Sequence, residues 1–234
     1  MKTPLVRRAA GVLAGGAAAA AAVYGAYAGL TWLRYGHVSV PRTPEDEDGV
    51  LDRVMPLYDV VERHHIDVHA PAELAFATAC ALDLMATPLA RAIFKAREVV
   101  MGSKPSRAEL PRGLVNAAQA LGWRVLAEVP ERELVFGAAT RPWEANPEFR
   151  SIAPQDFTSF AEPGYVKIAW TIRADPSRDV GCVFRTETRA VATDNRSREK
   201  FRRYWALVSP GVVLVRRGML MPVKRVAEWR ARAA

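Results

Sequence analysis

Apolar residues alternate with polar ones along the first part of the domain and then recur at helical spacing. Residues 58–68 show the alternation of a half-buried strand. The apolar positions of one parity in this stretch are Val60, Ile66 and Val68. Pro71 predicts the start of a helix, because proline suits the first helical turn. A second helix is expected after Pro88 and a short one over residues 114–121. The domain therefore begins with one strand and continues with helices.

Alternation returns after Gly122, a residue suited to the end of a helix, and predicts a run of further strands. These are residues 123–129, 133–140, 165–173 and 182–190. Short turns between them favour antiparallel pairing. A last helix is capped by Asp194 or Asn195, and Pro210 and Pro222 should kink or divide it. The expected fold class is α+β, with an antiparallel sheet and a long C-terminal helix.

The N-terminal segment has no charged residue from Ala9 to Leu33, and these 25 residues would form a helix about 37 Å long. A hydrocarbon core is about 30 Å thick, so residues 9–33 are predicted to form a transmembrane helix. Basic residues near the N-terminus favour a cytoplasmic start and an exported domain, as a single-pass membrane protein. Ala26-Tyr27-Ala28 leaves a cleaved signal peptide as the alternative.

The remaining organisation follows from composition. Residues 1–8 form a basic N-terminus, and residues 34–54 are expected to be a linker, because prolines and an acidic run deny them a core. Residues 55–234 form the domain. Two cysteines, Cys80 and Cys182, are too few for a disulfide framework, and whether they pair is left open.

The net charge of +8 is unevenly distributed along the chain. Residues 196–234 carry eleven Lys or Arg and two Glu, which gives +9 and leaves −1 for the rest. This basic stripe could face anionic lipid or simply be a solvated helix face. Nucleic acid is not an expected partner, because the stripe has no base-reading motif and is attached to a membrane segment.

The motifs that carry common enzyme chemistry are missing from the sequence. It has no G-x-S-x-G, no P-loop and no G-x-G-x-x-G, so no catalytic residue and no cofactor are predicted. His65 and His69 would share a strand face and His64 would point away from them. No cysteine or carboxylate pattern completes a metal site, so no metal is predicted and the histidines are expected at the surface or an edge.

The order of elements resembles the helix-grip fold of the SRPBCC superfamily, which includes START-like lipid carriers and polyketide cyclase-like proteins. Local sequences that carry the resemblance are residues 68–73 entering the first helix, Gly122-Trp123 opening the second strand, residues 162–167 and residues 202–205. The resemblance extends over about residues 56–220. The chain is most similar to uncharacterised bacterial members of the superfamily. It implies a curved sheet wrapped around the last helix, with an apolar cavity between them.

Such a cavity would be lined by aromatic and aliphatic residues, with a few polar groups to orient a ligand. The predicted lining residues are Trp123, Phe136, Ile168, Trp170, Phe184, Thr186, Thr188, Tyr204 and Trp205. The alternative is that the same residues simply fill the core.

Three functions are consistent with these features. The first is a membrane-anchored domain that binds or carries an apolar small molecule, such as a lipid or isoprenoid. The second is a cyclase- or dehydratase-like enzyme in the same cavity, which requires a buried acid–base pair. The third is an interaction module that docks on a membrane or a partner through the basic C-terminal residues.

Overall fold

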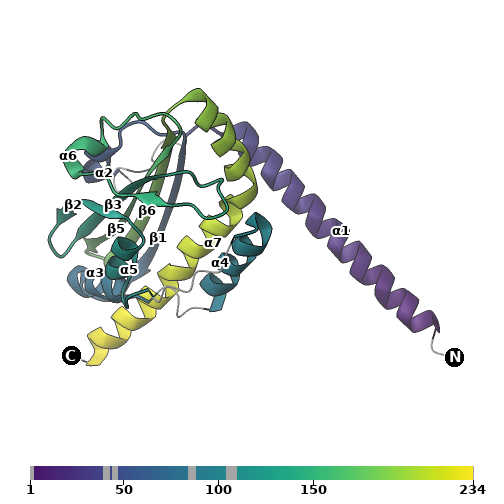
Figure 1. The fold of residues 1–234 in the computed structure, drawn as a ribbon. Coiled ribbons are helices and arrows are strands. Elements are labelled where there is room, and N and C mark those ends of the chain that lie inside the picture. Colours follow the sequence, from purple (N-terminus) through teal and green to yellow (C-terminus); the bar gives the residue numbers. More distant parts are fainter. Residues whose placement is uncertain (1–2, 39–42, 44–46, 84–87, 104–109, 234) are drawn as a thin grey trace.

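The computed structural model describes residues 3–38, 43, 47–83, 88–103 and 110–233, and only the backbone of residues 3–14, 17, 88–90 and 94. Its centre is one curved antiparallel sheet with the strand order β1-β6-β5-β3-β2, and β4 pairs with β3 (Figure 1). The strands are β1 (Val60–Val68), β2 (Arg124–Val129), β3 (Glu133–Thr140), β4 (Phe149–Arg150), β5 (Val166–Ser177) and β6 (Gly181–Ala192). The antiparallel sheet predicted from alternation is confirmed.

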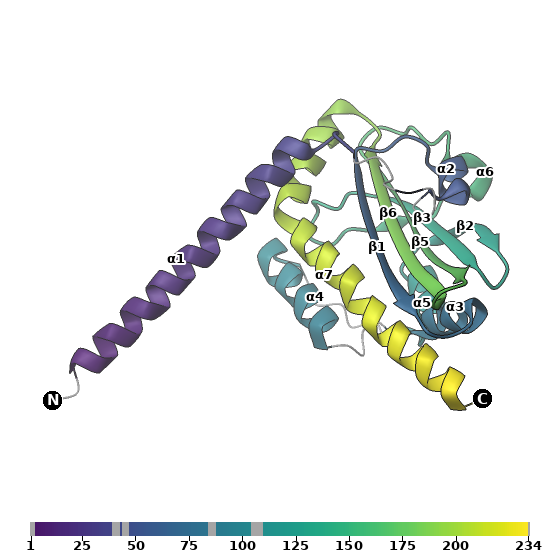
Figure 2. The same ribbon diagram turned by 180° about the vertical axis from the view of Figure 1, so that it is seen from behind.

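The helices lie at the N-terminus, between the first two strands and at the C-terminus, with one short helix before β5. They are α1 (Thr3–Arg34), α2 (Gly49–Val54), α3 (Ala72–Ala81), α4 (Pro88–Met101), α5 (Leu114–Ala120), α6 (Pro154–Phe157) and α7 (Asn195–Ala233). α7 crosses one face of the sheet, and α4 packs on α7 (Figures 1 and 2). Pro210 and Pro222 lie within α7 and do not divide it.

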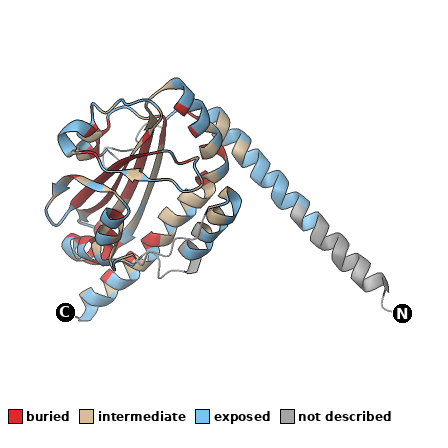
Figure 3. Cartoon of the chain, viewed as in Figure 1, coloured by how far each residue is buried: buried red, intermediate tan, exposed pale blue. Residues whose placement is uncertain are grey.

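The two faces of the sheet are covered differently. The inner face, toward α7 and α3, carries the main core, with Phe136, Trp170 and Phe184 buried (Figure 3). The outer face is covered by α2 and α6, whose Leu51 and Phe157 are fully buried. Alternation decides these faces, because successive side chains of a strand point to opposite sides.

Residues 48–54 contribute to this outer core although they fall within the segment expected to be a linker. Asp48 caps α2, since Leu51 N–H donates to its carboxylate at 2.8 Å, and Leu51 and Met55 are buried. The neighbouring acidic run favours a linker in the sequence, although its last residue, Asp48, caps this short helix. Arg42, Glu45, Asp46 and Lys2 lie outside the described residues.

One helix among the described residues is long and apolar enough to cross a membrane, and it is α7 rather than the N-terminal helix as expected. Alanine and glycine dominate the described turns of α1 and contribute little apolar surface. α7 owes its hydropathy to valines and leucines in its middle. Since α7 also contributes buried side chains to two clusters of the domain core, it is best described as a core helix.

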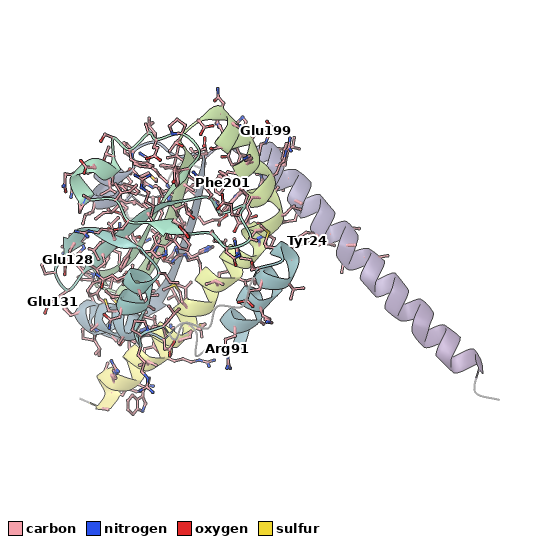
Figure 4. The ribbon with its side chains drawn as sticks, in the orientation of Figure 1. Tyr24, Arg91, Glu128, Glu131, Glu199 and Phe201 are labelled. Carbon is pink, nitrogen blue, oxygen red and sulfur yellow. The ribbon has the colours of Figure 1, made fainter. Side chains whose placement is uncertain are left out.

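α1 nevertheless extends away from the domain and is exposed along most of its described length (Figure 3). Only its last turns contact the domain. Arg202 of α7 donates to the carbonyl of Trp32 at 3.0 Å, and its guanidinium lies 4.3 Å from the Trp32 ring centroid. Tyr24, labelled in Figure 4, donates its hydroxyl to the carbonyl of Leu207. The N-terminal helix is thus fastened to the first third of α7.

Candidate functional site

α7 contributes buried side chains at two places and none in its loose middle, residues 210–218. Phe201, labelled in Figure 4, and Trp205 are buried in a cluster with Tyr35 and Val60. Farther along, Met219, Leu220, Val223 and Ala227 enter the main core. Between Ser209 and Met219 none of the nine residues, all described, is buried. The middle of α7 is therefore at most half-buried, although Trp170, Thr186 and Thr188 on the inner face of the sheet are buried.

Polar residues occupy the inner face between these two clusters. Glu62 is paired with Thr188, and His64 with Thr186, across β1 and β6. Thr188 is also the partner of Trp170 on β5. Because paired residues point to the same side of a sheet, these side chains all face α7. A half-polar patch therefore interrupts an otherwise apolar face.

Two buried polar atoms of this patch lack hydrogen-bond partners in the described part of the chain: His64 Nε2 and Thr188 Oγ1. The His64 side chain is 8% exposed, and its Nε2 lies 3.7 Å from Glu62 Oε2, too far for a hydrogen bond. Thr186, by contrast, donates to the carbonyl of Thr171 at 2.8 Å. Buried polar atoms are rarely left without partners, so their coincidence here indicates a site for an absent group.

Two arginines of α7 complete the patch. The Arg216 guanidinium lies 4.6 Å from the centroid of the Trp170 ring. No carboxylate of the described residues pairs with Arg216, and desolvation lowers its pKa to about 10. It therefore remains a cation at neutral pH. Arg217 is exposed, and its charge acts on both Glu62 and His64.

The pKa values of the two titratable groups on β1 move in opposite directions. Burial lowers the pKa of His64 to about 4, and the charges of Arg217, Arg216 and His65 act in the same direction. Burial raises the pKa of Glu62, while Arg217 opposes the rise. At neutral pH the imidazole is uncharged and keeps a free ring nitrogen beneath α7.

Lowering the pH should cost the His64→Gln variant about 2–3 kcal/mol less of its free energy of unfolding than it costs the wild type. The pKa of the imidazole is 6.5 in the unfolded chain and about 4 in the folded one, so the unfolded chain takes up the proton first as the pH falls. Stability is lost progressively across that window. Urea unfolding of both proteins at several pH values measures the effect. A difference between them that did not change with pH would show that the fold does not hold His64 neutral.

The predicted lining residues all lie on the inner face of the sheet or on α7, and fall into three groups. Four aromatic residues belong to the main core, where Phe136 stacks on Trp170 at 4.3 Å: Trp123, Phe136, Trp170 and Phe184. Three lie in the cluster at the other end of α7: Ile168, Tyr204 and Trp205. Thr186 and Thr188 belong to the polar patch between them. The aromatic residues therefore flank the patch, and Trp170 borders it directly.

Four residues of the patch were missed by the sequence analysis: Glu62, His64, Arg216 and Arg217. His65 and His69 are exposed, and His64 lies on the edge strand β1, as the expected surface or edge positions allow; its side chain is nonetheless only 8% exposed. A signal was available, because Glu62 and His64 share the parity of Val60 and Val68. Polar residues on the apolar parity of a strand must face the core.

Most cations of the basic stripe predicted for the C-terminal segment are exposed, and Arg202, Arg216 and Lys224 are half-buried. Lys224 donates to the carbonyl of Asp67 and pairs with Glu228 at 3.3 Å. Arg230 donates to Thr78 at 3.5 Å. Lys224 and Arg230 thus attach the end of α7 to β1 and α3, Arg216 turns toward Trp170, and the exposed cations remain open to solvent or an anionic surface.

A separate open groove of about 690 Å³ lies between α3 and α5. Phe76, Cys80, Val115 and Glu131 contribute to its walls, and Figure 4 labels Glu131. None of its described wall residues carries a buried polar atom without a partner. Cys80 and Cys182 are both free thiols, and burial raises the pKa of each to about 11, so neither is a reactive thiolate.

Neither a family model nor a curated protein sequence matches the chain. Among solved structures, it is similar to protein CV1439 from Chromobacterium violaceum, with 13% identity and a TM-score of 0.31 over 74% of this chain and 99% of that one. It is also similar to CalU16 from Micromonospora echinospora, with 11% identity and a TM-score of 0.25 over 74% and 85% of the two chains. These values do not show a family, so the site itself must support a function.

Proposed function

We propose that the chain is an SRPBCC-like helix-grip domain that binds or carries an apolar small molecule, such as a lipid, between the inner face of the sheet and the middle of α7. The observation that supports this proposal is the loose middle of α7, which lies over unpartnered polar atoms and is flanked by two closed aromatic clusters. A loosely covered, mainly apolar surface with a few convergent polar groups is the usual form of a small-molecule site.

The same proposal makes α1 a membrane tether through residues 9–33, with the N-terminus in the cytoplasm and the domain outside it. The uncharged run and its basic N-terminal flank support this arrangement. The contacts of Tyr24 and Trp32 with α7 end next to Ser209, where the loose segment begins. A ligand taken from the bilayer would thus enter close to the tether.

Replacing Thr188 with phenylalanine should block the site. Thr188 is nearly buried and faces α7, so a ring there fills the space beneath the loose segment. The full chain purified from membranes should carry an extractable apolar compound, and its amount in Thr188→Phe should fall at least about tenfold, a loss of about 1.4 kcal/mol of binding. Organic extraction followed by mass spectrometry measures this.

Thr188→Val is the matched control, since it removes the hydroxyl and keeps the volume. Because it loses one hydroxyl donor but keeps the space open, it should retain more of the apolar compound than Thr188→Phe does, and thermal unfolding checks that both variants fold. A wild-type chain that yields no compound above the background of the membrane, or a Thr188→Phe chain that retains all of it, would contradict the proposed site.

A second function, a dehydratase- or cyclase-like enzyme, is favoured by one observation. Glu62 and His64 lie 3.7 Å apart, and burial moves their pKa values in opposite senses, toward a protonated carboxyl and a neutral imidazole. Such a pair is suited to acid–base chemistry. A bound ligand would then lose the mass of one water on incubation and be unchanged in His64→Ala. Recovery of intact ligand from the wild type would count against catalysis of dehydration.

A further inference from the structure

We propose that Arg216 binds the anionic headgroup, a carboxylate or a phosphate, of an amphipathic ligand whose apolar body lies along the loose middle of α7. This inference rests on the proposed function and deepens it, because it names the ligand class as a charged single-chain amphiphile. The residues involved are Arg216, His64 and Thr188 at the head and the valines of α7 along the body.

Arg216 differs from the buried arginines on the outer face of the sheet in having no anionic partner among the described residues. Arg173 pairs with Asp175 at 2.7 Å, and Arg189 pairs with Glu187 at 2.7 Å. Arg216 instead contacts the face of the Trp170 ring. A desolvated cation is costly unless an anion compensates it. The domain supplies carboxylates that compensate the charges of Arg173 and Arg189, and the described residues supply none for Arg216.

Groups around Arg216 complete a binding site for an anion. The Thr188 hydroxyl and the His64 imidazole are nearly buried, face α7 and have no hydrogen-bond partner within the described ranges. Both can donate to an oxyanion, the imidazole as its Nε2–H tautomer. The carboxylate of Glu62 is the negative group of this patch, and Arg217 offsets its charge. Two arginines against one carboxylate leave the site attractive to a single negative charge.

The apolar body of the ligand is placed by valines that precede Arg216 on the same side of α7. Val208 and Val212 lie two turns and one turn before Arg216, and both are half-buried. Tyr24 of α1 donates to the carbonyl of Leu207, next to Val208, so this stretch begins beside the tether. A charged head at Arg216 and a chain running toward α1 match a molecule drawn head-first from a bilayer.

The test measures the binding of decanoate, decyl phosphate and decanol to the full chain in lipid nanodiscs. Tryptophan fluorescence reports the binding. Arg216→Gln should weaken decanoate and decyl phosphate about tenfold to hundredfold, as expected for a charge-assisted hydrogen bond, and leave decanol unchanged. Arg203→Gln, on the exposed side of α7 and paired with Glu199, is the matched control and should change nothing. Of the two anions, the one that binds more tightly identifies the headgroup.

Thermal unfolding separates a binding role from a structural one. If Arg216 binds an anion, Arg216→Met without ligand should unfold at the same temperature as the wild type or at a higher one. Decanoate should raise the unfolding temperature of the wild type but not that of Arg216→Met. A lower unfolding temperature with unchanged decanoate binding would overturn the inference and make Arg216 a structural partner of Trp170. Equal binding of decanol and decanoate would also overturn it while leaving the proposed function intact. Binding of none of the three would reject both.

Discussion

Arg189→Met is expected to lower the free energy of unfolding by about 3–5 kcal/mol, the cost of breaking a buried ion pair by removing one partner. The Arg189 side chain is 2% exposed and lies on the outer face of the sheet. It pairs with Glu187 at 2.7 Å and with Asp52 at 2.6 Å, and donates to the carbonyl of Met55 at 2.9 Å. Methionine fills the volume but removes the donor from the Met55 carbonyl and from Asp52, and leaves Glu187 with Arg63 alone.

The effect of Arg189→Met should extend to α2. Asp52 and Met55 are bound by this guanidinium, and the Tyr58 ring lies 4.5 Å from it, so the segment before β1 loses its main attachment. Urea unfolding gives the free energy, and hydrogen exchange reports loosening of residues 49–58. Arg150→Met is the control: Arg150 and Glu162 are about half exposed, and their pair should contribute less than about 1 kcal/mol. Equal losses in both variants would show that the buried network is not a special source of stability.

Gly122→Ala is expected to cost about 2–5 kcal/mol, through two effects at one position. The φ angle of Gly122 is +100°, a left-handed conformation that disfavours any residue with a Cβ by about 1–2 kcal/mol. A Cβ would also lie 2.2 Å from the carbonyl oxygen of Phe149, which is backbone and cannot rotate away. Relieving such an overlap costs a further 1–3 kcal/mol or so.

Gly102→Ala isolates the first of these effects. Gly102 has a φ of +64°, and no atom lies within 4 Å of the position that an alanine methyl group would occupy there, so its alanine variant should lose only about 1–2 kcal/mol. Chemical unfolding of both variants gives the comparison. Gly122 also directs Trp123 onto Phe149 and Trp170, so near-ultraviolet circular dichroism should change in Gly122→Ala. Identical losses in the two variants would mean that the approach to Phe149 relaxes at no cost.

The strands were predictable because alternation is a local property. The parity that puts Ile66 and Val68 inside and Arg63 outside is written in the sequence, and the pairing of β1 with β6 keeps it. Gly122 was likewise readable as a helix end, and its positive φ confirms it. α2, α6 and β4 were not predicted. They are two to six residues long, and α2 depends on the Asp48 cap and on burial of Leu51 against the sheet, which no local pattern shows.

The candidate site was only half readable, because it is assembled from residues far apart in the chain. The inward parity of Glu62 and His64 could have been noticed on β1. Their meeting with Thr188 depends on pairing across more than a hundred residues, and the position of Arg216 over Trp170 depends on the rotation of α7 about its axis. Helical periodicity identifies an apolar stripe but not which arginine at its border turns inward. The aromatic residues predicted as lining do lie on the inner side, and their role as lining stays a prediction.

The loose middle of α7 gives the proposal its physical basis. Natural cores are closely packed, and unpartnered polar atoms together with an unpaired arginine reduce stability. A fold keeps such a defect where it binds something. The clusters around Phe201 and around Trp170 flank this segment, which brings two unpartnered polar atoms and an unpaired arginine together at one place.

Photoaffinity labelling tests the location of the ligand most directly. A decanoate analogue with a diazirine on its chain is irradiated with the full chain in nanodiscs, and the labelled peptides are sequenced. The account predicts saturable labelling of α7 between Leu207 and Met219, with labelling of β6 near Thr188, both lost in the presence of excess decanoate. Labelling concentrated on Phe76 and Val115 in the groove between α3 and α5, or labelling that excess decanoate does not reduce, would contradict it.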